Sequence, residues 1–336
     1  MDASLFSQIN TAISVCEARM VTKEQFEQLL SVDDRERMAL TLQETNYKLD
    51  KESLADPNVI EQVLIKNLAD EYRFAFEETP VEEVAQLFAL RYTYHNLKVL
   101  LKARATQTDL SELILPIGRY SQEILEHLVT TLTSEVCPSV MVEEVSATWL
   151  EFLDYQDMRV LDIGMDMAYF KHLKQLAEEL DTPELTDFVN LTIDFYNVIT
   201  VKRGLNQDKP NSFMRQLLSD DALMKARDYL KLYEDQSLLT WFNQVYPNSF
   251  DLSTKSFESG LAQADISAVE LEYLMDLLRF QVLEQGRFET QGPLPLARYL
   301  WGKELEVKNL RLILTGRSND LSSEVLKERM RPVYGQ

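Results

Sequence analysis

The chain has few of the residues that make turns or covalent cross-links. Its 336 residues include 9 glycines, 10 prolines and 2 cysteines. Loops and hairpins depend most on glycine and proline, so their scarcity favours long helices over sheets. Two cysteines are too few for a disulfide framework or a cysteine zinc site, and the start Met1-Asp2-Ala3 has no basic and apolar leader. We therefore expect a reduced, cytoplasmic protein.

Several kinds of site are also missing. No run of about 18 uncharged apolar residues occurs, so the chain is not expected to span a membrane by itself. The glycines are scattered singly, without a phosphate loop or a dinucleotide fingerprint, which predicts no nucleotide binding and no cofactor. The three histidines lack the spacing of a metal site, and adjacent acids such as Glu143 and Glu144 diverge by about 100° on a helix. We expect no metal and no catalytic residues.

Charge is plentiful but uneven. The net charge of −21 argues against a nucleic-acid partner, whose phosphates require a concentrated basic face. Between Ala105 and Thr192 there are 17 acidic and 4 basic residues, whereas the segment from Arg287 to the end carries a net charge of +3. An acidic majority suits a basic protein partner, and it equally suits a solvated surface kept soluble by charge.

A short pattern occurs three times, at 94–100, 195–201 and 307–313. Each copy is centred on an asparagine: Asn96, Asn197 and Asn309. The copies are 101 and 112 residues apart, longer than the roughly 20–50 residues of solenoid repeats, so each belongs to a unit the size of a small domain. An amide within an apolar helix stripe costs free energy unless it is bonded, so each asparagine either ties its helix to a neighbouring backbone or contacts a partner directly.

The surroundings of the asparagines are also similar. Apolar residues recur at spacings of mostly 3, 4 and 7, which places them on one stripe of a helix. A proline precedes each helix at 80, 183 and 293, and Gly204 and Gly316 follow the second and third asparagines, with Ala103 in the first copy. The chain is therefore predicted to be all-α, with one unit triplicated over residues 1–105, 106–206 and 207–336.

Periodicity predicts individual helices along the whole chain. Thr22 and Gln25 form a capping box, and residues 206–211 form the clearest linker. The expected helices cover 5–20, 22–30, 35–45, 57–75, 81–104, 113–132, 142–153, 157–180, 183–204, 213–232, 238–245, 253–261, 268–288, 294–315 and 322–330.

At these residues the sequence resembles the C subunit of the bacterial and archaeal V/A-type rotary ATPases, the family of the eukaryotic V-ATPase d subunit. The resemblance covers essentially the whole chain. Its most specific part runs from 292–296 through Tyr299-Leu300, Glu304 and 306–314 to Arg317, and a second part is 92–98 with 102–104.

The resemblance implies three similar helical domains arranged as a funnel around a pseudo-threefold axis. Such a protein sits on the membrane rotor ring at the cytoplasmic face and receives the lower end of the central axle. It is not catalytic; it couples the ATP-hydrolysing head to a ring that carries H⁺ or Na⁺. The implied partners are the axle subunits and the ring subunits.

Three arginines just after the repeats, Arg104, Arg203 and Arg317, are candidates for contact with polar loops of the ring. Cations at these positions also complement the C-termini of helices, so capping is the other interpretation. Two further functions stay open. A general helical scaffold that binds a partner in a concave face fits the composition equally well, and a metal-free helical enzyme would need a polar cluster that we do not find.

Overall fold

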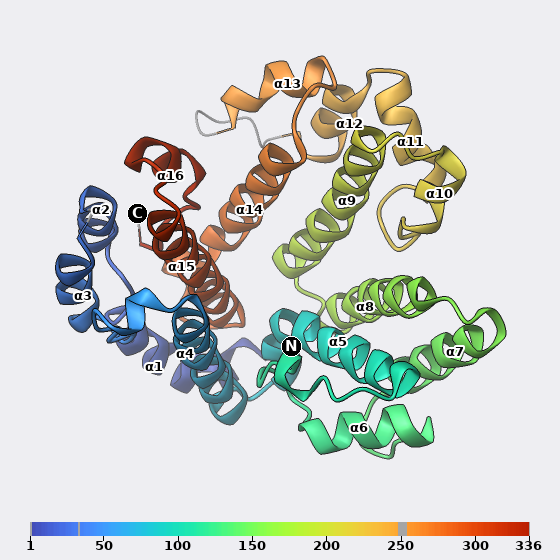
Figure 1. The fold of residues 1–336 in the computed structure, drawn as a ribbon, viewed down its shortest axis with the longest axis horizontal. Coiled ribbons are helices and arrows are strands. Elements are labelled where there is room, and N and C mark those ends of the chain that lie inside the picture. Colours follow the sequence, from blue (N-terminus) through green and yellow to red (C-terminus); the bar gives the residue numbers. More distant parts are fainter. Residues whose placement is uncertain (1, 33, 248–253, 336) are drawn as a thin grey trace. The chain divides into compact units, whose positions relative to one another are not determined.

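A computed structural model describes residues 2–32, 34–247 and 254–335 (Figure 1). Throughout this part of the chain the regular elements are α-helices and short 3₁₀ helices, and none is a strand. The predicted all-α class is therefore confirmed. The first residue of the helix expected over 253–261 lies outside the described residues.

The chain forms two compact units that alternate along the sequence. Unit 1 comprises Met1–Thr93, Leu113–Gln122 and Leu283–Gln336, and unit 2 comprises Tyr94–Glu112 and Glu123–Val282. The helix α5 (Glu82–Thr106) contains the boundary between Thr93 and Tyr94. Each unit is described by itself below.

Unit 1 is built around the long helix α15 (Leu294–Ser318), which packs against α4 and α1 and is followed by α16 (Figure 1). Most of α15 is buried, including its charged residues Lys303, Glu304 and Glu306. Its other elements are η1 (Ala3–Phe6), α1 (Ser7–Glu17), α2 (Lys23–Ser31), α3 (Arg35–Gln43), η2 (Ser53–Ala55), α4 (Pro57–Glu78), the start of α5, η5 (Gln285–Phe288) and α16 (Ser323–Arg329).

In unit 2, α7 packs against α8 and α8 packs against α9. Apolar residues of α9 form a buried core with residues of the helices that follow it in the chain. Its aromatic centre includes Phe195, whose ring meets that of Phe242 at 90°. The elements are the rest of α5, α6 (Gln122–Thr131), α7 (Ser139–Tyr155), α8 (Met158–Leu180), α9 (Pro183–Asn206), α10 (Asn211–Gln216), α11 (Ala226–Glu234), α12 (Leu238–Val245), η4 (Lys255–Phe257), α13 (Glu258–Ala262) and α14 (Ala268–Glu284), with η3 (Ser111–Leu113) at the boundary of the units.

Local sequence signals account for several helix starts. The Thr22 hydroxyl accepts the N–H of Gln25 at 3.2 Å, and the Gln25 side chain accepts the N–H of Thr22 at 2.9 Å, so the predicted capping box is confirmed. Pro183 stands in the first turn of α9, where its missing N–H costs nothing. In α15, Pro293 is the N-cap and the helix begins one residue later.

Two predicted helices were wrong in extent. The helix expected over 113–132 begins only at Gln122, because Pro116 lacks an N–H and Gly118 takes a φ of +143°. The helix expected over 213–232 is two helices, α10 and α11. The intervening backbone bonds to side chains instead: Ser219 N–H donates to Asn197, and Leu223 N–H donates to Asp194.

Candidate functional site

The same local structure surrounds the second and third asparagines. On α9, Asn197 donates from Nδ2 to the Ser219 carbonyl at 2.8 Å and accepts the Ser219 N–H at 2.9 Å. On α15, Asn309 donates to the Arg331 carbonyl at 3.0 Å and accepts the Arg331 N–H at 2.7 Å. Both amides are buried, and each pairs with the backbone 22 residues further on. We call each such arrangement an asparagine module.

The two modules agree beyond the amides. The short helices α10 and α16, at Asn211 and Ser323, each begin 14 residues after the asparagine. The long helices are alike too, with 25 residues in α5, 24 in α9 and 25 in α15. Asn96, in the first copy, is likewise buried on its long helix. The sequence repeat therefore corresponds to a repeated piece of structure in at least the second and third copies.

The glycines after the asparagines have a packing role. A Cβ added at Gly204 would lie 2.3 Å from the sulfur of Met214, and a Cβ added at Gly316 would lie 2.4 Å from a methyl carbon of Leu326. Met214 belongs to α10 and Leu326 to α16, and both are buried. The missing side chain thus lets the short helix approach the long one.

A buried carboxylate stands three residues before the asparagine in both modules. Asp194 is fully buried and accepts hydrogen bonds from the Leu223 N–H at 3.0 Å, the Tyr229 hydroxyl at 2.5 Å and the Tyr246 hydroxyl at 2.8 Å. Burial raises the pKa of Asp194 above its ordinary value, although the tyrosine hydroxyls partly offset this. Its bonds join α9 to α11 and to the end of α12.

Glu306 occupies the corresponding place on α15. It accepts the Val21 N–H at 2.6 Å, the Tyr47 hydroxyl at 2.7 Å and the Lys303 ammonium at 2.5 Å. Burial and the adjacent Glu306 charge raise the pKa of Tyr47 well above its ordinary value, so this hydroxyl stays protonated as a donor. Both carboxylates have the same kinds of donor, a backbone N–H and tyrosine, and both hold neighbouring segments together.

A second carboxylate on α15 binds α4 and α5. Glu304 accepts the Tyr72 hydroxyl at 2.7 Å and the Tyr92 hydroxyl at 2.9 Å, and it pairs with the Arg91 guanidinium. A buried carboxylate is costly unless it is bonded, and Glu304 is bonded by all three groups. The cluster thereby ties α15 to α4 and to the first part of α5. Sequence reasoning noted Glu304 and Glu306 only as part of the family pattern, although charges within a mainly apolar helix were the available signal.

The three arginines proposed for the ring contact belong to different surroundings. In unit 2, Arg104 donates to the Val129 carbonyl and lies over the Trp149 ring at 4.0 Å. Arg317, in unit 1, donates to the Leu30 carbonyl and to the Ser323 hydroxyl. Arg203 is the most exposed of the three and pairs with Glu272. Each therefore already has a partner within its own unit.

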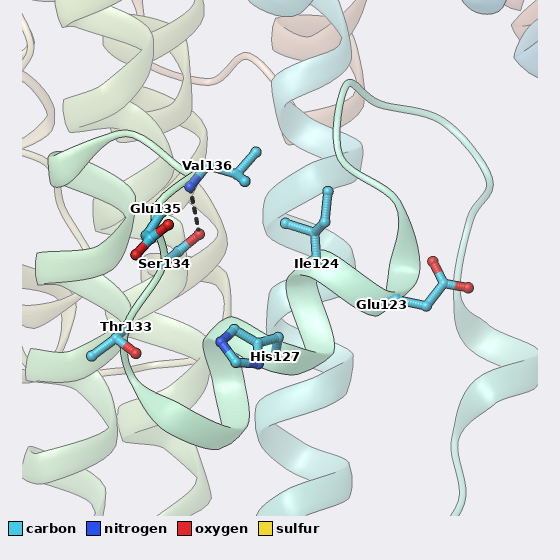
Figure 2. A pocket seen from close by; sticks show the side chains of 7 residues that line it. All are labelled: Glu123, Ile124, His127, Thr133, Ser134, Glu135 and Val136. Atoms are coloured by element: carbon cyan, nitrogen blue, oxygen red, sulfur yellow. Dashed lines mark hydrogen bonds between the residues drawn. The ribbon is translucent and has the colours of Figure 1, made fainter.

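A surface hollow of about 500 Å³ lies in unit 2 between α6 and the segment leading to α7 (Figure 2). The Val136 N–H donates to the Ser134 hydroxyl at 3.2 Å, and Glu123 extends away from the other side chains (Figure 2). The hollow is lined by Glu123, Ile124, His127, Thr133, Ser134, Glu135 and Val136. Its carboxylates and apolar side chains suit a basic group better than an acidic one.

Within the described residues, no helix is long and apolar enough to cross a membrane. The same part of the chain contains no group of three or more histidine, cysteine, aspartate or glutamate side chains placed to hold a metal ion.

Together, these features define an all-helical protein with repeated asparagine modules and buried charge clusters. Comparison with known proteins gives its class: residues 9–329 match the family described as ATP synthase (C/AC39) subunit, so the chain belongs to that family. The resemblance to the C subunit of V/A-type ATPases is thereby confirmed.

Two relatives illustrate the match. The chain is 29% identical over 339 residues to the C subunit of the V-type sodium ATPase of Enterococcus hirae, covering 98% of this chain and 99% of the relative. It is 24% identical over 357 residues to the C subunit of the A-type ATP synthase of Methanocaldococcus jannaschii, covering 97% and 86%. The protein is thus a subunit of a V/A-type rotary ATPase.

Proposed function

We propose that this chain is a non-catalytic subunit of the central stalk, which couples the rotary axle of the ATP-hydrolysing head to the membrane rotor ring. The observation that carries the proposal is the asparagine module, found on α9 and again on α15 in a member of the C/AC39 family. A part that passes on torque must resist deformation. Buried amide pairs and carboxylate clusters brace the long helices in the way such a part requires.

The proposed architecture is three similar helical domains, 1–105, 106–206 and 207–336, arranged as a funnel around a pseudo-threefold axis. The equal spacing of both asparagine modules supports a duplicated ancestral unit. The buried Asn96 on a helix of the same length supports a third copy.

The proposed partners are the axle subunits and the ring subunits, reached from the cytoplasmic face of the membrane. Arg203 is the best placed of the three arginines to contact the ring, because it is exposed. Arg104 and Arg317 would contribute mainly by holding the ends of α5 and α15 in place.

Deletion of the chain in cells that make the complex tests this role. Membranes lacking the chain should lose coupled ion transport, measured for both H⁺ and Na⁺, while the detached head retains ATP hydrolysis. Adding the purified chain back should restore transport together with attachment of the head. Coupled transport that persists without the chain would contradict the proposal.

The add-back is repeated with the Asn206→Leu chain, which controls for purification and handling because its change lies at the exposed end of α9. It should restore transport as well as the parent does. If neither chain restores it while both are folded, loss of another subunit explains the defect, and the experiment must be repeated with that subunit supplied.

A further inference from the structure

The buried carboxylates of the two asparagine modules bind segments from different parts of the sequence. Asp194 accepts a backbone N–H at 3.0 Å and the Tyr246 hydroxyl at 2.8 Å, from donors 29 and 52 residues later. Glu306 accepts the same kinds of group at 2.6 and 2.7 Å from Val21 and Tyr47, which precede it by 285 and 259 residues. Equivalent donors thus reach α15 from a remote part of the chain.

The helices beside these donors also correspond. In unit 2, α11 begins at Ala226 and α12 at Leu238; in unit 1, α2 begins at Lys23 and α3 at Arg35, so the second helix starts 12 residues after the first in both pairs. The helices α11 and α2 have 9 residues each. Within unit 2 α11 packs against the short helix α10, and within unit 1 α2 packs against the short helix α16 (Figure 1). The pair α2 and α3 therefore has the place beside α15 and α16 that α11 and α12 have beside α9 and α10.

Side chains of α15 and α16 hold α2 in this place. Ser323, at the start of α16, donates from its hydroxyl to the Leu30 carbonyl at 2.7 Å, and Arg317 donates to the same carbonyl. Phe26 of α2 and Leu42 of α3 are buried. These two helices are therefore part of the core of unit 1.

The preceding helix, α1, is also docked on α15. Asn10 donates to the Gly292 carbonyl at 3.1 Å, and Glu17 pairs with Arg298 at 3.0 Å. We call the stretch from α1 through Tyr47 the N-terminal clasp.

The two repeats differ in how their helices are connected. In unit 2, residues 217–225 join α10 directly to α11. Lys23 of α2 precedes Ser323 of α16 by 300 residues, so these helices are not joined by a short connection. A short connection keeps a detached helix close to its partner and favours rebinding, because closing a small loop costs little entropy. The clasp lacks this connection, and its release should therefore cost less free energy than the release of α11 and α12.

We infer that the N-terminal clasp completes the repeat on α15 and that it opens as one piece. In the open state α1, α2 and α3 leave α15 and α16 together, while α4 and α15 stay packed; such local opening below the free energy of global unfolding is a general property of folded chains. The repeat in the proposed domain 207–336 is thus completed by residues from the range 1–105. The inference rests on the repeated modules and does not depend on the proposed coupling role.

Hydrogen exchange of the purified full chain, measured by mass spectrometry, tests the inference. We expect the backbone amides of α2 and α3 to exchange about tenfold or more faster than those of α11 and α12. The amides of α1 should exchange with the same dependence on low urea concentrations as those of α2 and α3. Equal protection of the two helix pairs, or exchange of the clasp only together with α15, would overturn the inference.

A pair of tyrosine variants tests whether the opening is local. Tyr47→Phe should speed exchange in the clasp about threefold or more, because Glu306 loses a hydrogen-bond donor, and should leave α4 and α15 unchanged. The matched control, Tyr246→Phe, removes the same kind of donor from Asp194 and should leave the clasp unchanged. An equal rise throughout unit 1 in Tyr47→Phe would show that the clasp does not open by itself.

A rearranged chain tests whether the connection is the cause. A flexible linker of about 30 glycine and serine residues joins Gln336 to Met1, and new ends are opened between Asp221 and Ala222, in the connection from α10 to α11. The order of exchange should reverse, so that α11 and α12 exchange about tenfold or more faster than α2 and α3. The control is the parent with the same linker added after Gln336 and left unjoined, which should keep the original order.

An unchanged order of exchange in the rearranged chain, or its failure to fold, would contradict the equivalence of the two repeats. None of these outcomes bears on coupled transport in the deletion experiment, so the two proposals can fail separately.

Discussion

Asn309 Nδ2 donates to the carbonyl oxygen of Arg331 at 3.0 Å, and the Arg331 N–H donates back to Asn309 Oδ1 at 2.7 Å. Asn197 and Ser219 exchange the same two bonds in unit 2. Each side-chain amide therefore satisfies both polar groups of one backbone residue. No apolar side chain of similar size can replace it without leaving an N–H and a carbonyl unsatisfied.

Replacement of either asparagine by leucine should lower the free energy of unfolding. Asn197→Leu and Asn309→Leu should each cost about 1–3 kcal/mol, because a buried backbone donor and acceptor lose their partner. Urea unfolding measures the change, and Asn206→Leu at the exposed end of α9 serves as the control. A variant that unfolds like the parent but fails to enter the complex would instead identify its asparagine as a contact residue.

The contact between Gly204 and Met214 predicts coupled effects on stability. In the parent, Gly204→Ala should cost about 1–3 kcal/mol through overpacking against Met214 and gain about 1 kcal/mol in helix propensity. The overpacking cost is the larger of the two, so the net effect should be a loss of stability. In a Met214→Ala background the clash is gone, so the same change should become neutral or stabilising. A double-mutant cycle by chemical denaturation checks this, and strictly additive costs would contradict it.

His172 should make stability depend on acid pH. Its ring is buried, contacts the Tyr94 hydroxyl at 3.2 Å, and burial lowers its pKa to about 4. Between the ordinary pKa near 6.5 and pH 4 the unfolded chain binds a proton that the folded chain does not. The free energy of unfolding is therefore not reduced by His172 above pH 6.5. It falls as the pH drops from 6.5 through 4, by about 3 kcal/mol in total.

The difference in unfolding free energy between the parent and His172→Gln isolates this effect from the carboxylates. It should shift in favour of the variant as the pH falls from 7 to 4.5. His127→Gln, at an exposed position of α6, gives the background effect of removing an imidazole. A difference for His172→Gln that stays constant with pH would show that the histidine is protonated equally in both states.

Reversal of the three arginines should separate support of the fold from contact with the ring. Arg317→Glu removes the donor to the Leu30 carbonyl and should cost about 1–3 kcal/mol of stability. Arg203→Glu breaks only an exposed ion pair and should change stability by less than about 1 kcal/mol.

Association with the ring is then measured by co-sedimentation at low and moderate salt. We expect Arg203→Glu to weaken it, and reversal of Arg104, Arg203 and Arg317 together to weaken it further while binding of the axle persists. Ring binding equal to the parent by a folded triple variant would remove these residues from the interface and leave their internal roles.

The sequence predicted much of the local structure because helix signals are local. The Thr22 capping box and the proline start at Pro183 depend on residues only a few places apart. The helix predicted over 213–232 was wrong because its apolar pattern was considered without the acceptors Asp194 and Asn197, which lie about 20 or more residues earlier on α9 and bind that backbone.

By itself, the sequence determined the all-α class, the repeated asparagine and the family. The tertiary structure alone decided which groups pair. Tyr47 meets Glu306 across 259 residues, and Arg317 meets Leu30 across 287. Periodicity specifies which side of a helix is apolar, but it does not specify which distant segment covers that side. The burial of Glu306 and the internal bonds of Arg317 therefore follow from packing, because each depends on what lies against a helix and not on the helix alone.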